Sequence, residues 1–123
     1  MKDSMGRYDE TVVIYFSKEE FEKIQLVKQK IWNTSDAAVL RLLLRNALYE
    51  LKDKDSLDVR IDLTKDYDRE VSAMRVVPLQ PDEYELFDRL YRKTGFTKTL
   101  FAKILAMPQA EKIINGGSIE INV

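Results

Sequence analysis

The chain has 123 residues, of which 33% are charged and 45% hydrophobic, and its formal net charge is −1. This length suffices for one compact domain, residues 1–123, and is too short for two ordinary ones. The absence of cysteine and histidine excludes disulfides and thiolate metal sites, and it removes the commonest general base and metal ligand. We therefore expect no enzymatic activity, no metal, no cofactor and no small-molecule substrate.

The sequence also lacks the signals of membrane insertion and export. No run approaches the ~18 consecutive apolar residues of a membrane span. The N-terminus, MKDSMGRYDE, has no apolar signal-peptide core. We expect a cytoplasmic protein with no membrane partner.

Charge is distributed unevenly along the chain. Residues 18–52 and 73–107 each carry a net charge of +2, whereas residues 53–72 carry −3. Two mildly basic segments joined by an acidic connector are compatible with a nucleic-acid partner.

The first basic segment predicts a strand followed by two helices. VVIYF (12–16) is typical of a strand, Ser17 of an N-cap, and Glu19 and Glu20 of a first helical turn. Apolar residues at helical spacing follow, namely Phe21, Ile24, Val27 and Ile31, and we expect Trp32 to lie in the core with the aromatics of this helix. NTSD (33–36) then separates this helix from a second, 37–51, which is apolar on nearly all sides and must be buried on more than one face.

The second basic segment repeats this plan. Residues 74–79 predict a strand, and Pro81 is suited to the first turn of the following helix. Gly95 breaks that helix, and a second apolar helix, 99–107, is expected to end at Pro108.

The two halves can be aligned position by position, which indicates an internal repeat. Tyr84, Phe87 and Leu90 are spaced as Phe21, Ile24 and Val27 are. The alignment shifts by a single position at the turn, where Gly95 corresponds to Asn33, and it then continues along the second helices.

Two further segments read as strands outside the repeat. LDVRIDL (57–63) alternates apolar and polar residues, and SIEINV (118–123) follows a Gly-Gly turn. The chain thus divides into a first unit (11–52), an acidic connector (53–72), a second unit (73–107) and a C-terminal tail (108–123).

The two units resemble the ribbon-helix-helix transcriptional regulators, whose turn and second helix typically read G-x-S-x-S-x-L-I-R-x-A-L. At those places the second unit has Gly95, Thr97, Thr99, Phe101, Ala102, Lys103 and Leu105, and the first has Asn33, Ser35, Ala37, Val39, Leu40, Arg41 and Leu43. The arrangement is similar to fused, tandem regulators of archaeal filamentous viruses. The resemblance implies an α+β fold in which tandem repeats form an intramolecular pseudo-dimer, with an antiparallel ribbon over four helices and one or two additional strands.

The resemblance also implies a function, namely sequence-specific binding of double-stranded DNA by a viral or plasmid-encoded transcriptional regulator. Ribbon-helix-helix proteins insert the ribbon into the major groove. The resemblance implies that the outward ribbon residues contact the bases, and these are Thr11, Val13, Tyr15, Met74 and Val76. It implies that the turns between the helices hold the DNA phosphates, through Thr34, Ser35, Thr97 and Lys98. Plain strand propensity also accounts for Thr11 and Tyr15, and helix capping for the hydroxyls of the turns.

The outward ribbon residues depart from the family, which generally has polar or basic side chains there. Apolar groups can touch thymine methyls but do not recognise guanine. A register that turned Arg75 outward would take Val77 and Leu79 out of the core. We therefore expect residues 57–63, residues 118–123 or a second molecule to cover the ribbon, at least in the free protein, which leaves open a homo-oligomer formed through the ribbon or the extra strands. The alternative function is a protein-interaction module, inhibitor or antitoxin-like, that docks its partner on the apolar ribbon.

Overall fold

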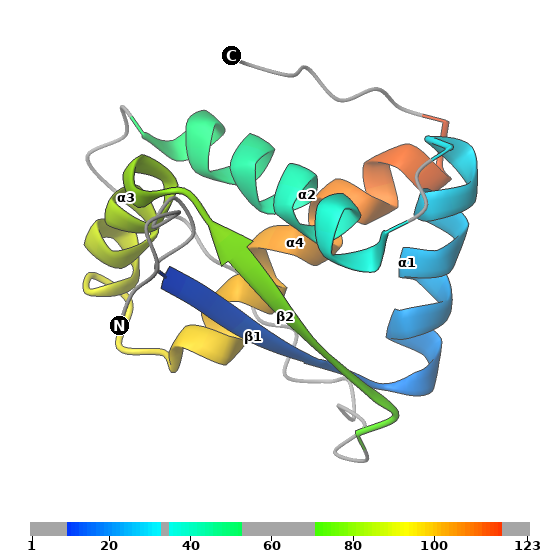
Figure 1. Cartoon of the computed structure of the whole chain (residues 1–123), viewed down its shortest axis with the longest axis horizontal. Helices are drawn as coiled ribbons and strands as arrows, with labels where there is room; N and C mark the ends of the chain where they lie inside the picture. Colours follow the sequence, from blue (N-terminus) through cyan, green and yellow to red (C-terminus); the bar gives the residue numbers. More distant parts are fainter. Residues whose placement is uncertain (1–9, 33–34, 53–70, 117–123) are drawn as a thin grey trace, which may run out of the picture.

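The computed structural model of the chain describes residues 10–32, 35–52 and 71–116. This part of the chain is α+β, with one two-stranded antiparallel sheet lying across four helices (Figure 1). In chain order the elements are β1 (Glu10–Phe16), α1 (Lys18–Lys30), α2 (Asp36–Leu51), β2 (Ala73–Leu79), α3 (Pro81–Tyr91) and α4 (Lys98–Ile114). The predicted succession of strand, helix and helix, repeated once, is confirmed. The candidate strands at 57–63 and 118–123 lie outside the described residues.

The register of the two strands follows the repeat. Val13 pairs with Val76, which is its equivalent when the alignment of the first helices is extended back into the strands. The inward-facing side chains are almost fully buried, namely Val12, Ile14, Phe16, Val77 and Leu79. The predicted register is confirmed, since Val77 and Leu79 are buried and Arg75 does not face outward. The alternative register, with Arg75 outward, would have exposed Val77 and Leu79 to water.

The first helix of each half begins with a glutamate that accepts a hydrogen bond from the backbone N–H of the N-cap residue. Glu20 accepts a hydrogen bond from the backbone N–H of Ser17 at 2.8 Å, and the Ser17 hydroxyl accepts one from the backbone N–H of Glu20 at 3.2 Å. In the second half, Glu83 accepts a bond from the backbone N–H of Gln80 at 2.8 Å, and Pro81 occupies the first turn as predicted. These contacts satisfy backbone donors that have no partner within the helix.

The second helices form the centre of the core, as their apolar sequences predict. α4 packs against β1 and α2 packs against β2, while α2 and α4 also pack against each other. Each second helix therefore lies against the strand of the other half. Their buried hydrophobic residues are Val39, Leu40, Leu43, Leu44, Ala47 and Leu48 on α2, and Phe101, Ala102, Leu105, Ala106, Ala110 and Ile113 on α4. Neither half could bury these side chains alone.

Two corresponding ion pairs join the halves. Lys103 of α4 lies 3.0 Å from Glu20 of α1, and Arg41 of α2 lies 2.9 Å from Glu83 of α3. Glu83 is the more deeply buried glutamate, since its side chain is 2% exposed, whereas that of Glu20 is 23% exposed. Arg45 approaches Glu83 as well, at 3.7 Å.

The prediction that Pro108 ends the last helix is wrong. α4 continues through Pro108 to Ile114. Proline removes one backbone hydrogen bond and strains a helix interior, at a cost of about 3 kcal/mol. The residues after it keep the buried stripe, because Gln109, Ala110 and Ile113 are all buried. The free energy gained by burying these side chains outweighs the cost of Pro108 in the helix.

The expectation that Trp32 lies in the core is also wrong, because this side chain is 92% exposed. Trp32 has a left-handed backbone, with φ of 57°, and Gly95, which follows the first helix of the other half, has φ of 77°. The backbone reverses after both first helices, but only the second turn has the residue that adopts this conformation without strain. The reversal takes Trp32 off the apolar face of α1 and leaves its ring in solvent.

Candidate functional site

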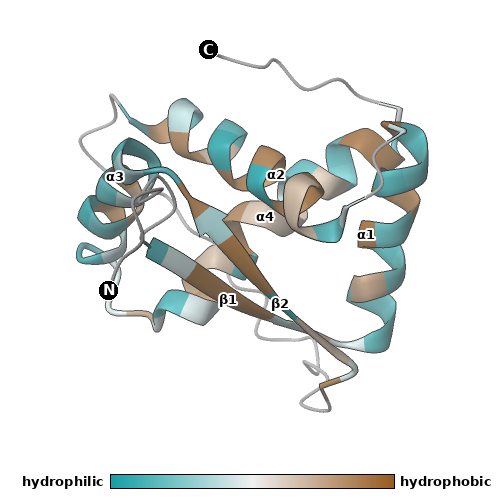
Figure 2. Ribbon diagram, viewed as in Figure 1, coloured by the Kyte–Doolittle hydropathy of each residue, from teal (hydrophilic) through white to brown (hydrophobic). Residues whose placement is uncertain are grey.

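The outward face of the ribbon is an apolar strip made of three cross-strand pairs, Thr11–Pro78, Val13–Val76 and Tyr15–Met74. Tyr15, Met74 and Val76 are 43%, 45% and 46% exposed. Figure 2 shows hydrophobic residues along the middle of both strands. Thr11 and Tyr15 supply the strip's polar side-chain atoms, both as hydroxyls. We call these six residues the ribbon strip.

The strip lies between the starts of two helices. In Figure 1 the first turns of α2 and α4 lie on opposite sides of the ribbon. The packing of α2 against β2 and of α4 against β1 places both helices next to the strands. The predicted ribbon and turn residues are thereby brought to one region, apart from Thr34, which lies outside the described residues.

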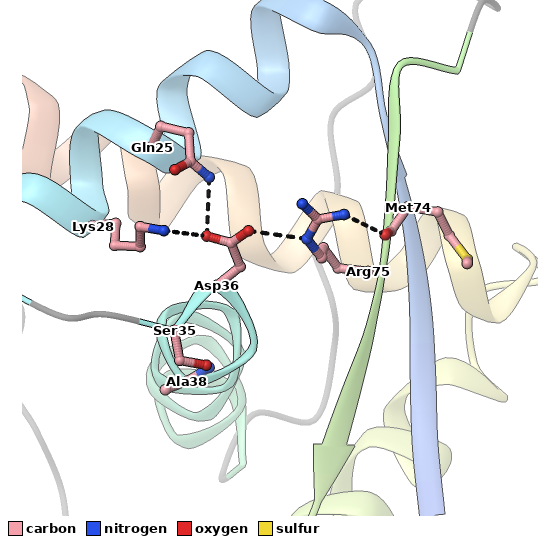
Figure 3. A network of polar contacts seen from close by, with 7 residues as sticks. All are labelled: Gln25, Lys28, Ser35, Asp36, Ala38, Met74 and Arg75. Atoms are coloured by element: carbon pink, nitrogen blue, oxygen red, sulfur yellow. Dashed lines mark hydrogen bonds and ion pairs between the residues drawn. The ribbon is translucent and has the colours of Figure 1, made fainter.

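At the start of α2, the carboxylate of Asp36 collects three donors (Figure 3). Gln25 and Lys28 of α1 donate to Oδ1 at 3.0 and 2.9 Å, and Nε of Arg75 donates to Oδ2 at 3.0 Å. Burial by itself would raise the pKa of Asp36, but these hydrogen bonds outweigh it and lower the pKa to about 2. Asp36 is therefore ionised at neutral pH, and it ties α1, α2 and β2 together.

Arg75 connects this network to the ribbon. Its Nη1 donates to the backbone carbonyl of Met74 at 2.8 Å, and its guanidinium lies 4.7 Å from the centre of the Phe21 ring. The side chain thus lies on the core-facing side of β2, as predicted, and is held at the edge by a cation–π contact and an ion pair. The pairing of Arg75 with Asp36 was not expected from the sequence, because strand alternation gives no information about which helix lies beside the strand.

At the start of α4, Lys98 makes a different set of contacts. Its Nζ donates to the hydroxyl of Tyr84 at 2.6 Å and lies 5.3 and 5.6 Å from the ring centres of Tyr84 and Tyr91. The hydrogen bond to Tyr84 raises the pKa of Lys98, so its charge is retained at neutral pH. No acidic residue occupies the first turn of α4. This flank of the ribbon therefore keeps an exposed positive charge.

The hydroxyls predicted to hold phosphates cap these helices. Ser35 accepts a hydrogen bond from the backbone N–H of Ala38 at 3.2 Å, and Thr97 accepts one from that of Leu100 at 3.1 Å. Capping leaves other backbone N–H groups of the first turn facing outward, together with the positive end of the helix dipole. The geometry is compatible with both the capping and the phosphate interpretation.

The two helix starts differ in charge although the repeat makes them equivalent. Asp36 and Lys98 each follow the N-cap of a second helix, Ser35 and Thr97, and they carry opposite charges. The negative charge of Asp36 is offset by Lys28 at 2.9 Å and Arg75 at 3.0 Å. Both flanks of the ribbon strip are consequently net positive, although by different means.

Within the described ranges 10–32, 35–52 and 71–116, no helix is long and apolar enough to cross a membrane. The same ranges contain no cluster of three acidic side chains arranged to hold a metal ion. In comparisons with known proteins, no family model, no curated protein and no solved structure matches this chain.

Proposed function

We propose that this protein is a sequence-specific regulator that binds double-stranded DNA with its ribbon, as a ribbon-helix-helix pseudo-dimer formed within one chain. The observation that carries the proposal is the register, in which Val13 faces its repeat equivalent, Val76. A two-fold axis through this pair would exchange the two strands. It would also exchange the ion pair Glu20–Lys103 with the pair Glu83–Arg41, because the repeat relates the two glutamates to each other and the two cations to each other.

The distribution of charge along the chain is compatible with a polyanionic partner. Residues 18–52 and 73–107, which contain most of the two strand-helix-helix units, each carry a net charge of +2, although the whole chain has −1. Lys98 and the first turn of α4 offer a positive charge and backbone N–H groups beside the ribbon, and a two-stranded ribbon fits the major groove. The ribbon would enter the groove while the helix starts hold the phosphates on either side.

The test is fluorescence-anisotropy titration of a randomised duplex pool at several salt concentrations, followed by selection of the bound fraction. We expect an enriched sequence and an affinity that falls steeply as salt rises, because phosphate contacts release counterions. Lys98→Glu should weaken binding at least tenfold and reduce the salt slope. Lys112→Glu is the control, since it makes the same charge change near the other end of α4.

A second candidate is favoured by the apolar character of the ribbon strip, which suits a protein partner better than it suits guanine-rich DNA. In that case Val13→Asp abolishes partner binding while Lys98→Glu leaves it intact. A protein that binds no duplex even at low salt would contradict the DNA proposal and favour this second candidate.

A further inference from the structure

The ribbon strip lacks the side chains that read most bases. Its six residues include no Lys, Arg, Asn, Gln, Asp or Glu, which are the side chains that make paired hydrogen bonds to guanine or adenine or accept one from cytosine. Val13, Met74, Val76 and Pro78 present only aliphatic or thioether groups. In the major groove the one apolar feature of a normal base pair is the 5-methyl group of thymine. We propose, resting on the DNA-binding function above, that the ribbon strip selects its site by contact with thymine methyl groups.

The dimensions of the strip suit such contacts. Outward residues on one strand are spaced by about 7 Å, and outward partners across the strands by about 5 Å. From Met74 to Pro78 the outward face of β2 therefore spans about 14 Å, which equals about four base-pair steps of about 3.4 Å. Val13 and Val76 lie at its centre. A run of about five A·T pairs, joined by these four steps, would bring methyl groups along the whole strip.

Positive charge beside the ribbon strip favours DNA over an uncharged apolar partner. The strip is neutral. Lys98 lies on one side of it, and the cluster of Lys28, Arg75 and Asp36 on the other side carries one net positive charge. An apolar strip between two positive borders is complementary to the floor of a T-rich major groove between its two phosphate backbones.

The two ends of the strip differ, which predicts an asymmetric site. The pair Tyr15–Met74 forms one end and Thr11–Pro78 the other. A palindromic site would be expected only if the strip were symmetric, since operator symmetry follows protein symmetry. We expect a T-rich core whose two flanks differ in sequence.

The experiment replaces every thymine in the selected duplex by deoxyuridine, which removes only the methyl groups. Burial of one methyl group corresponds to about a fourfold change in affinity. The loss of two or more contacts should therefore weaken binding at least tenfold, and the salt slope should stay constant because the phosphates are unchanged.

The variant Val76→Thr, at an exposed central position that tolerates threonine, should lower affinity for the thymine duplex. It should also reduce the ratio of the affinity for the thymine duplex to the affinity for the uracil duplex. Lys98→Gln serves as the matched control, since it should change the salt slope but not that ratio.

The outcomes separate this inference from the function on which it rests. Specific binding that is equal for thymine and uracil duplexes would overturn methyl readout and leave the DNA-binding proposal standing. An equal uracil penalty in wild type and Val76→Thr would overturn it too, because the penalty would then come from duplex shape. Failure to bind any duplex would remove the function itself. A ribbon-to-ribbon dimer that persists on bound DNA, seen by sedimentation, would show that a second copy covers the strip and would overturn the inference.

Discussion

The buried ion pair of Glu83 offers a direct test of how the two halves hold together. Its carboxylate accepts bonds from Arg41 Nε at 3.1 Å and Arg41 Nη2 at 2.9 Å, besides the backbone N–H of Gln80. In Glu83→Gln, the retained oxygen can still accept from Gln80, but the new amide N–H₂ faces the Arg41 donor. The substitution thus removes the charge between the halves while it preserves the start of α3.

The expected cost follows from burial. Breaking a fully buried ion pair costs about 3–5 kcal/mol. Arg41 and Arg45 are 25% and 24% exposed, so water partly solvates them, and we expect a loss of about 2 kcal/mol. With a urea dependence of about 2 kcal/mol per M, the unfolding midpoint should fall by about 1 M. The corresponding change Glu20→Gln is the control; its pair with Lys103 is more exposed, and its cost should stay below about 1 kcal/mol.

Equilibrium urea unfolding, followed by circular dichroism, measures both variants under the same conditions. Adding Arg41→Met to Glu83→Gln should recover part of the stability, because it removes a partly buried charge that no longer faces the Glu83 carboxylate. Equal destabilisation by Glu83→Gln and Glu20→Gln would refute the reasoning, since burial would then have no influence on the strength of the pair.

Three further predictions concern stability. Trp32→Gly should raise the free energy of unfolding by about 1 kcal/mol, because glycine adopts the positive φ without strain and the lost ring is almost wholly exposed; a lower urea midpoint would contradict this. The stability that Asp36 contributes should be fully present above pH ~5 and be lost as the pH falls through its folded-state pKa of about 2. After allowance for solvent screening this contribution is about 1 kcal/mol, so the gap in unfolding free energy between wild type and Asp36→Asn should close between about pH 5 and pH 2; a gap independent of pH would count against the network. Pro108→Ala should stabilise α4 by about 1–2 kcal/mol by restoring a hydrogen bond to the carbonyl of Ile104, and a thermal midpoint no higher than that of wild type would show that the helix had already relaxed around the proline.

Local sequence patterns by themselves determined the elements and their order. The family resemblance, rather than strand alternation, indicated that Ile14 and Phe16 face the core. Capping chemistry placed the start of the first helix at Ser17, and the second helices begin within one residue of their predicted starts at 37 and 99. These features depend on interactions within a few residues, so a single sequence contains the information. The internal repeat also anticipated which strand residues are equivalent.

Only the tertiary structure decided which residues from distant elements meet. The end of α4 depended on burial of its last turns, which overrode the local effect of Pro108. The exposure of Trp32 depended on where the backbone reversed, and the contrast between Asp36 and Lys98 depended on neighbours contributed by α1, β2 and α3. Such pairings arise from packing between segments that lie far apart in the chain, and the periodicity of the sequence does not predict them.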